Sequence, residues 1–168
     1  MVMKKFKWLL PIVIISLFVN GNLCGQTTQT QLNQLELIKQ FIGNWTAEMG
    51  KDTTIVCEYK LFGTGMEDYY KAFTNGKIFL SEKGLWGYDK KNDKNIHAQL
   101  WDPSCRLDIN VWWFTSKNIC EGVQYQYISN PENATLKWKL EFKSTDLMIM
   151  TTTLNSKVVS TMTFTREK

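Results

Sequence analysis

The sequence predicts an all-β fold: a closed or nearly closed antiparallel up-and-down barrel of about ten strands, preceded by one short helix that caps an end. From Gly43 onward, apolar and polar residues alternate with the period of two that is typical of β-strands. Turn residues recur regularly, and Asn75-Gly76 is the best hairpin signal, because a type I′ turn needs φ > 0 at both central residues. No helical period of crossover length interrupts the strands, which excludes a parallel sheet. Closure into a barrel then hides the edges of the long strands.

The first 25 residues have the pattern of a secretory signal peptide. Three lysines within the first seven residues precede an apolar run over 8–19, which is too short to span a membrane. Cleavage is expected after Gly21 or Gly25, and we favour Gly25, which gives a signal peptide over 1–25. The mature chain is therefore expected to be secreted or periplasmic, without an integral membrane segment.

A cysteine close to the cleavage site raises the alternative of a lipid anchor. Acylation of Cys24 would require a small residue immediately before it, and the chain has Leu23 there. We therefore do not expect a lipid anchor at this position.

The charge balance excludes nucleic acid as a partner. The whole chain has 20 basic and 16 acidic residues, but three of the lysines belong to the signal peptide. The mature chain is close to neutral and has no Lys/Arg cluster that could neutralise a row of phosphates. Its length is that of one domain, so residues 26–168 are expected to form a single barrel domain.

The mature chain is expected to begin with a polar tether over 26–30, made only of Gln and Thr, and a helix over 31–42. In this helix apolar residues recur at three- and four-residue steps, and Gly43 follows as a C-cap. The apolar face must be buried, and one open end of the barrel is the natural place for it. The residues that define this face are Leu32, Leu35, Ile38 and Ile42.

Two sets of short segments in the sequence resemble known families of β-barrel proteins. Gly43-Asn44-Trp45 opens the first expected strand, and Arg166, one of only two arginines, stands near the end of the last. This pair resembles the lipocalin-like (calycin-type) β-barrels. The resemblance implies that the Trp and the Arg pack together and close the bottom of the barrel. The segment from Gly84 to Asp89, with Trp101-Asp102 after it, resembles a family of uncharacterised secreted bacterial proteins with such barrels.

The inward-facing positions are rich in aromatic and polar residues, which leaves two explanations open. Aromatic residues can fill a packed core, or they can line a ligand cavity, which barrels of eight or more strands can enclose. We favour a cavity, because polar residues such as Asp68 on inward positions would be costly in a dry core without partners. The candidate ligand-binding residues are Tyr59, Asp68, Tyr70, Trp86, His97, Trp101, Trp113, Tyr125, Tyr127 and Trp138.

The expected function is the binding of a small apolar or amphipathic ligand by an exported, non-catalytic carrier or sensor without a cofactor. Two alternatives stay open: a barrel enzyme of the isomerase or cyclase type that uses His97, and a structural envelope protein with a filled core. His97 is the only histidine, and catalysis would need an orienting carboxylate, for which Asp68 and Asp108 are candidates by residue type alone. We expect a hydrogen-bonded structural histidine. No metal-ligand spacing, phosphate loop or nucleophile motif appears in the sequence.

Three cysteines follow the signal peptide: Cys57, Cys105 and Cys120. If a hairpin turn lies at 116–118, Cys120 lies opposite Phe114, and Cys105 is then too far along the strand to form a disulfide with it. Cys57 lies several strands away from both. The sequence therefore predicts buried or semi-buried free thiols.

The expected strand over 106–115 is apolar on both faces near Trp112-Trp113. Its outer face would meet a partner, a second protomer or another part of the chain. Trp112 or Phe114 on that face would form an unusual apolar patch. This pattern suggests a homodimer contact through the Trp112/Phe114 face.

Overall fold

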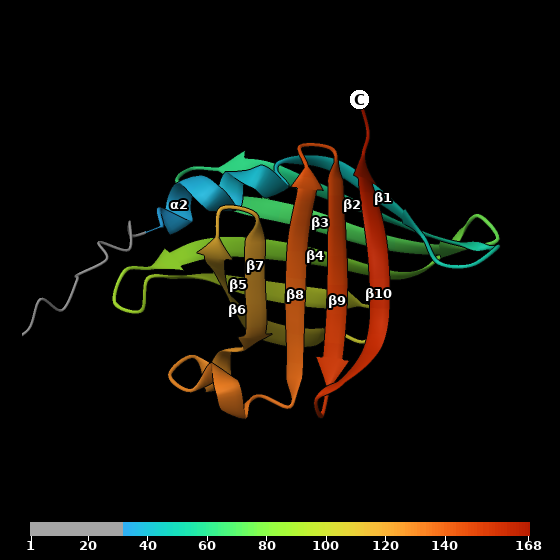
Figure 1. Cartoon of the computed structure of the whole chain (residues 1–168). Helices are drawn as coiled ribbons and strands as arrows, with labels where there is room; N and C mark the ends of the chain where they lie inside the picture. Colours follow the sequence, from blue (N-terminus) through green and yellow to red (C-terminus); the bar gives the residue numbers. More distant parts are fainter. Residues whose placement is uncertain (1–31) are drawn as a thin grey trace, which may run out of the picture. The chain divides into compact units, whose positions relative to one another are not determined.

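The computed structural model describes residues 32–168, so the expected signal peptide (1–25) and tether (26–30) lie outside the described residues. Residues 32–168 form one closed antiparallel barrel with the strand order β1-β10-β9-β8-β7-β6-β5-β4-β3-β2 (Figure 1). The predicted all-β barrel is confirmed. Its strands are β1 (Gly43–Glu48), β2 (Thr53–Phe62), β3 (Gly65–Thr74), β4 (Lys77–Asp89), β5 (Lys94–Asp102), β6 (Arg106–Ser116), β7 (Ile119–Gln124), β8 (Leu136–Ser144), β9 (Leu147–Leu154) and β10 (Lys157–Arg166).

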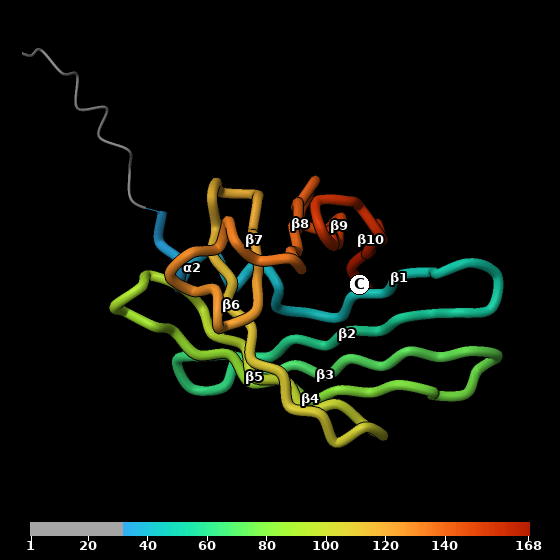
Figure 2. Tube along the Cα trace, turned by 90° about the horizontal axis from the view of Figure 1, so that it is seen from below, coloured from blue at the N-terminus to red at the C-terminus, as the bar shows by residue number. Residues whose placement is uncertain are grey.

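The barrel closes between its first and last strands. Each strand pairs with its neighbours in sequence, and β1 pairs in addition with β10, which it meets beside the C-terminus (Figure 2). Trp45 is the register partner of Arg166, and Thr46 that of Thr165. Closure satisfies the backbone groups that an open sheet would leave at its edges.

Two turns show the side-chain chemistry that the sequence predicts. Asn75 and Gly76, between β3 and β4, have φ values of 51° and 73°, as a type I′ turn requires. After β4, the Asp89 carboxylate accepts hydrogen bonds from the backbone N–H of Lys91 (2.9 Å) and of Asn92 (3.4 Å). These turns fix how β3, β4 and β5 follow one another.

The helix predicted over 31–42 is present but shorter, as α2 (Gln34–Leu37) continued by the 3₁₀ turn η1 (Ile38–Phe41). The Gln34 side chain anchors it to β6, because its Nε2 donates to Phe114 O (3.0 Å) and its Oε1 accepts from Phe114 N (2.6 Å). Gln34 thus takes the place of a strand beside Phe114, because the pairing of β6 with β5 has already ended at Trp112. No helix in residues 32–168 is long and apolar enough to cross a bilayer.

The short helix also delivers an aromatic side chain into the core. Phe41, at the end of η1, is 1% exposed. Its ring centroid lies 5.1 Å from that of Phe142, 5.4 Å from that of Tyr59 and 5.7 Å from that of Trp86. Phe41 therefore links β2, β4 and β8 at one end of the barrel interior.

The seam between β1 and β10 has the geometry that the lipocalin-like resemblance implies. The guanidinium of Arg166 lies 4.3 Å from the centroid of the buried Trp45 ring, a cation–π distance. Its Nη2 donates to Gln40 O (2.9 Å), its Nη1 donates to Ile42 O, and its Nε donates to Thr145 O (2.8 Å). One side chain thus ties the helix, the first strand and the β8–β9 turn together.

Replacing Arg166 with alanine should lower the free energy of unfolding by about 1–3 kcal/mol, because the variant loses these charged hydrogen bonds and the stacking on Trp45. Arg106→Ala is the matched control, since this arginine is exposed and forms a surface ion pair with Asp108 that is worth little. Urea denaturation of both variants measures the difference. Equal stability of the two variants would contradict the role given to the seam.

The structure corrects the predicted homodimer contact. Trp112 and Phe114 are 7% and 2% exposed and face the barrel interior, so they form no outer patch. The outer face of β6 presents Val111 and Trp113 instead, and these residues pack against Val123, Tyr127 and Ala134. Another part of the chain, the segment after β7 with its 3₁₀ turns η2 (Tyr125–Tyr127) and η3 (Pro131–Asn133), therefore covers this face.

The three cysteines of residues 32–168 are free thiols, as the sequence predicts. Cys120 is paired with Phe114 in the β6–β7 ladder, which is the register expected from the hairpin turn. Cys57 and Cys120 are buried, whereas Cys105 is exposed in the turn between β5 and β6. The expectation that all three thiols are at least half-buried is therefore wrong for Cys105, which lies in a turn rather than on a strand.

Candidate functional site

A cavity of about 150 Å³ lies inside the barrel. Its walls combine aromatic rings, methionines and buried polar side chains from β2 to β6 and from β8 to β10, and Phe41 adds to them from η1. The candidate residues that line it are Tyr59, Asp68, Tyr70, Trp86, His97, Trp101 and Trp138.

Three candidate residues lie elsewhere. Trp113 faces outward and lines a hollow of about 450 Å³ beside β7 and β8. Lys94 Nζ lies 4.6 Å from the centroid of the Trp113 ring. Tyr125 is 45% exposed, and Tyr127 packs against the cluster under the outer segment. The predicted alternation of inward and outward side chains fails here because β7 ends at Gln124. Both tyrosines belong to η2 rather than to a strand.

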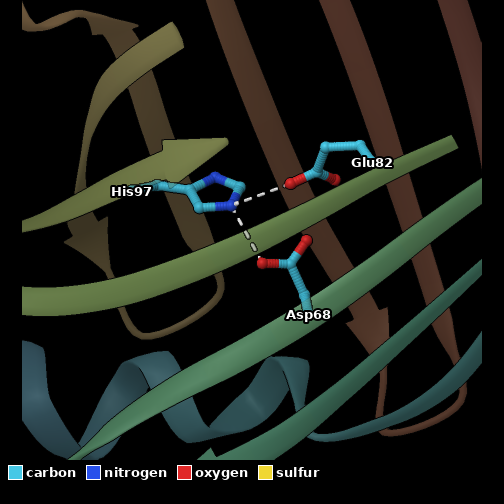
Figure 3. A group of neighbouring side chains, drawn as sticks. All are labelled: Asp68, Glu82 and His97. Atoms are coloured by element: carbon cyan, nitrogen blue, oxygen red, sulfur yellow. Dashed lines mark hydrogen bonds and ion pairs between the residues drawn. The ribbon is translucent and has the colours of Figure 1, made fainter. Parts of the chain in front are cut away.

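Three titratable side chains converge in the cavity from three consecutive strands. Asp68 comes from β3, Glu82 from β4 and His97 from β5, and they are 2%, 5% and 4% exposed. His97 Nε2 lies 2.9 Å from Asp68 Oδ1 and 3.7 Å from Glu82 Oε1 (Figure 3). We call this group the carboxylate–histidine cluster.

A glycine makes room for the carboxylate–histidine cluster. Gly84 is the register partner of Asp68 on one side and of Gln99 on the other. A Cβ atom added at Gly84 would come within 3.0 Å of Asp68 Oδ1, His97 Nε2 and Glu82 Oε1. The three polar atoms therefore occupy the space that any other residue at this position would fill.

Trp86 holds the histidine and the aspartate in place. Its ring is stacked on that of His97, with the centroids 3.9 Å apart and the planes 14° from parallel. Its Nε1 donates a hydrogen bond to Asp68 Oδ1 at 2.7 Å. One side chain thus fixes both the plane of the imidazole and the position of the carboxylate.

Burial makes the site electrostatically unusual. Burial, followed by the nearby negative charge of Asp68, raises the pKa of Glu82 to about 9, so this carboxyl group holds a proton at neutral pH. Burial also raises the pKa of Tyr70 to about 12 and raises that of the Cys57 thiol well above its usual range. These groups therefore line the cavity in their neutral forms.

Several buried polar atoms around the cavity have no hydrogen-bond partner among the described residues. On the cluster they are Glu82 Oε1 and His97 Nδ1, and on the aromatic wall they are Trp101 Nε1 and Trp112 Nε1. Nearby, Asn110 Nδ2 donates to Gln99 Oε1 at 2.5 Å. Buried polar groups are nearly always satisfied in proteins, so these donors and acceptors indicate where a bound molecule would be recognised.

The sequence identifies only part of this cluster. Asp68 was one of two candidates for a carboxylate that orients His97, and it is the residue that contacts the ring. Asp108, the other, pairs with Arg106. Glu82 and Gly84 are not among the residues that the sequence analysis identifies. They alternate with Trp86 on β4, and all three are buried, so they lie on the same inward face of this strand.

No protein-family model matches the chain, and no curated protein matches it in sequence.

Proposed function

We propose that the protein binds a small amphipathic molecule inside the barrel, as an exported carrier or sensor. The observation that carries this proposal is the cavity with an apolar wall, a buried polar cluster and unpartnered donors and acceptors. A structural protein with a filled core would have no use for this combination, because buried unpaired polar groups cost stability. Export is proposed from the signal-peptide pattern of residues 1–25.

The cavity volume limits the size of the ligand. A dry cavity of about 150 Å³ in another protein accepts one benzene molecule. The cavity here is of the same size, so it fits a single ring or a short branched chain rather than a long-chain lipid. The ligand class is therefore a ring-sized compound.

The walls determine which groups such a compound carries. Met148, Met150 and Phe164 supply apolar contacts on one side, and Trp138 adds a flat face. Glu82, in contrast, presents an unpartnered polar atom on the other side. A benzene ring with one short polar substituent would satisfy both sides.

Tryptophan fluorescence and calorimetry with benzyl alcohol, benzylamine and benzoate test this proposal. We expect saturable binding of at least one of them to the wild type and none of palmitate, which is too long for the cavity. Met150→Trp should abolish binding, because Met150 lines the cavity and a larger side chain there would fill it. Ile149→Trp is the matched control, since Ile149 lies next to Met150 and on the other face of β9. Binding of palmitate, or equal binding by both variants, would contradict a ring-sized interior site.

The contact between Asp68 and His97 favours the enzyme alternative as a second candidate. A carboxylate that holds an imidazole by a hydrogen bond is the arrangement that general base catalysis uses, and Glu82 adds a neutral carboxylic acid beside it. An isomerase or cyclase could use such an acid–base pair. Loss of turnover in His97→Gln with ligand binding retained would favour this candidate.

A further inference from the structure

We propose that Asp68, Glu82 and His97 form a binding site for one transition-metal ion of the Zn²⁺ type at the polar end of the cavity. The spacing of the three residues in the sequence does not predict this site, because each ligand comes from a different strand. The inference goes beyond the proposed binding of a ring-sized compound, which needs no metal ion.

The distances between the donor atoms suit one ion. Ligand atoms about 2.1 Å from an ion, at the angles of tetrahedral or octahedral coordination, lie about 2.9–3.4 Å from one another. His97 Nε2 lies 2.9 Å from Asp68 Oδ1 and 3.7 Å from Glu82 Oε1, and all three donor atoms lie within 4.8 Å of one another. Only small side-chain movements separate this arrangement from a coordination shell.

The charges of the site also favour a cation. Two carboxyl groups are buried within a few ångströms of each other, and Glu82 Oε1 has no hydrogen-bond partner among the described residues. Two buried carboxylates repel each other, and a bound divalent ion would neutralise both. Metal ligands coordinate in their deprotonated forms, so binding would release protons.

Neighbouring residues hold these donors in place, as is usual around metal sites. The Trp86 ring lies flat against His97, and its Nε1 donates to Asp68 Oδ1. Gly84 leaves the space in which the three donor atoms meet. The site is thus built on rigid strands, with supporting contacts on two of its three ligands.

The donor set indicates the kind of metal. One imidazole nitrogen and two carboxylate oxygens suit Zn²⁺, Mn²⁺ or Fe²⁺, whereas Ca²⁺ takes six to eight oxygen ligands. Three protein ligands on Zn²⁺ leave a fourth position open. Here that position would be in the cavity that Trp101 and Trp138 also line.

Calorimetry with Zn²⁺ tests the site, in a Cys105→Ser background that removes the exposed thiol. We expect one Zn²⁺ ion per chain and a melting temperature that rises with Zn²⁺. Glu82→Gln and His97→Gln should each weaken binding by at least about 100-fold, and Trp86→Phe, which loses the hydrogen bond to Asp68, by about 10-fold. Glu67→Gln is the matched control, because this carboxylate lies next to Asp68 on β3 and forms an ion pair with Lys83.

Co²⁺ as a spectroscopic probe separates this site from binding by thiols. Cys57 lines the same cavity, and its thiolate would give a sulfur-to-cobalt charge-transfer band, which the proposed ligands do not. Absence of saturable Zn²⁺ binding, a charge-transfer band, or equal affinity in the folded Glu82→Gln variant and the wild type would each overturn the proposal. Binding of ring-sized compounds is measured in the presence of EDTA, which removes metal ions. The proposed ligand binding and the proposed metal site can therefore be refuted separately.

Discussion

Replacing Trp45 with alanine should lower the free energy of unfolding by about 3–5 kcal/mol, the cost typical of removing a large buried aromatic side chain. Trp45 is 0% exposed, and its Nε1 donates to Phe41 O at 2.7 Å. Its ring also lies under the guanidinium of Arg166 and meets the edge of Phe142, with centroids 6.2 Å apart. The variant would lose all of these contacts and leave a cavity at the seam. Urea denaturation followed by circular dichroism measures the loss.

Trp113→Ala makes the same chemical change on the outside of the barrel and serves as the control. Trp113 is half-buried and packs against the segment that follows β7, away from the seam. We expect a smaller loss of stability for this variant, because less apolar surface is returned to water. If Trp113→Ala lowered the free energy of unfolding as much as Trp45→Ala does, the seam would contribute no more to the stability of the barrel than its outer face.

Gly84→Ala should abolish the carboxylate–histidine cluster and lower the free energy of unfolding by about 1–3 kcal/mol. The new methyl group would overlap Asp68 Oδ1, His97 Nε2 and Glu82 Oε1, so these buried side chains would have to move apart. Their displacement would also break the contact between Asp68 and Trp86. Denaturation gives the change in stability, and Zn²⁺ calorimetry gives the effect on the site.

Gly87→Ala is the matched control for this prediction. Gly87 lies on the same strand, and a Cβ atom added there would meet nothing within 4 Å. Its replacement changes backbone freedom to a similar extent but leaves the cavity untouched. A Gly84→Ala variant that is as stable as Gly87→Ala and still binds Zn²⁺ would contradict the geometry of the cluster.

The fold could be predicted from the sequence because its cues are local. The alternation of apolar and polar residues gives each strand its faces, and Asn75-Gly76 fixes a tight hairpin. The pairing of Trp45 with Arg166 was expected through a family resemblance rather than from local pattern, and the structure shows it. The faces of β6 could not be assigned, because the residues under the segment after β7 are as apolar as those in the core.

The site was predicted less completely than the fold, and a β-bulge is one reason, because it changes the register of β4 after the Asn75-Gly76 turn. Continued pairing from the Asn75-Gly76 turn would place Lys83 opposite Asp68, but the register shifts between Ala72 and Phe73, so that Gly84 lies there instead. A shift of one residue moves every later side chain of a strand to the other face. The bulge therefore puts Glu82 and Gly84 on the inward face, and their alternation with Trp86, a predicted cavity residue, is the sequence signal that points to them.

The seam joins parts of the chain that are far apart, and this separation bears on how the barrel forms. Hydrogen bonds of Arg166 bridge 124 and 126 residues, whereas those of Asp68 to Trp86 and His97 bridge 18 and 29. Distant contacts cost more chain entropy and form late in folding. The three strands that carry the cluster can therefore assemble as a meander of neighbouring hairpins before β1 and β10 meet. We expect amide hydrogen exchange to show the same order in reverse, with the seam opening first and β3 to β5 last.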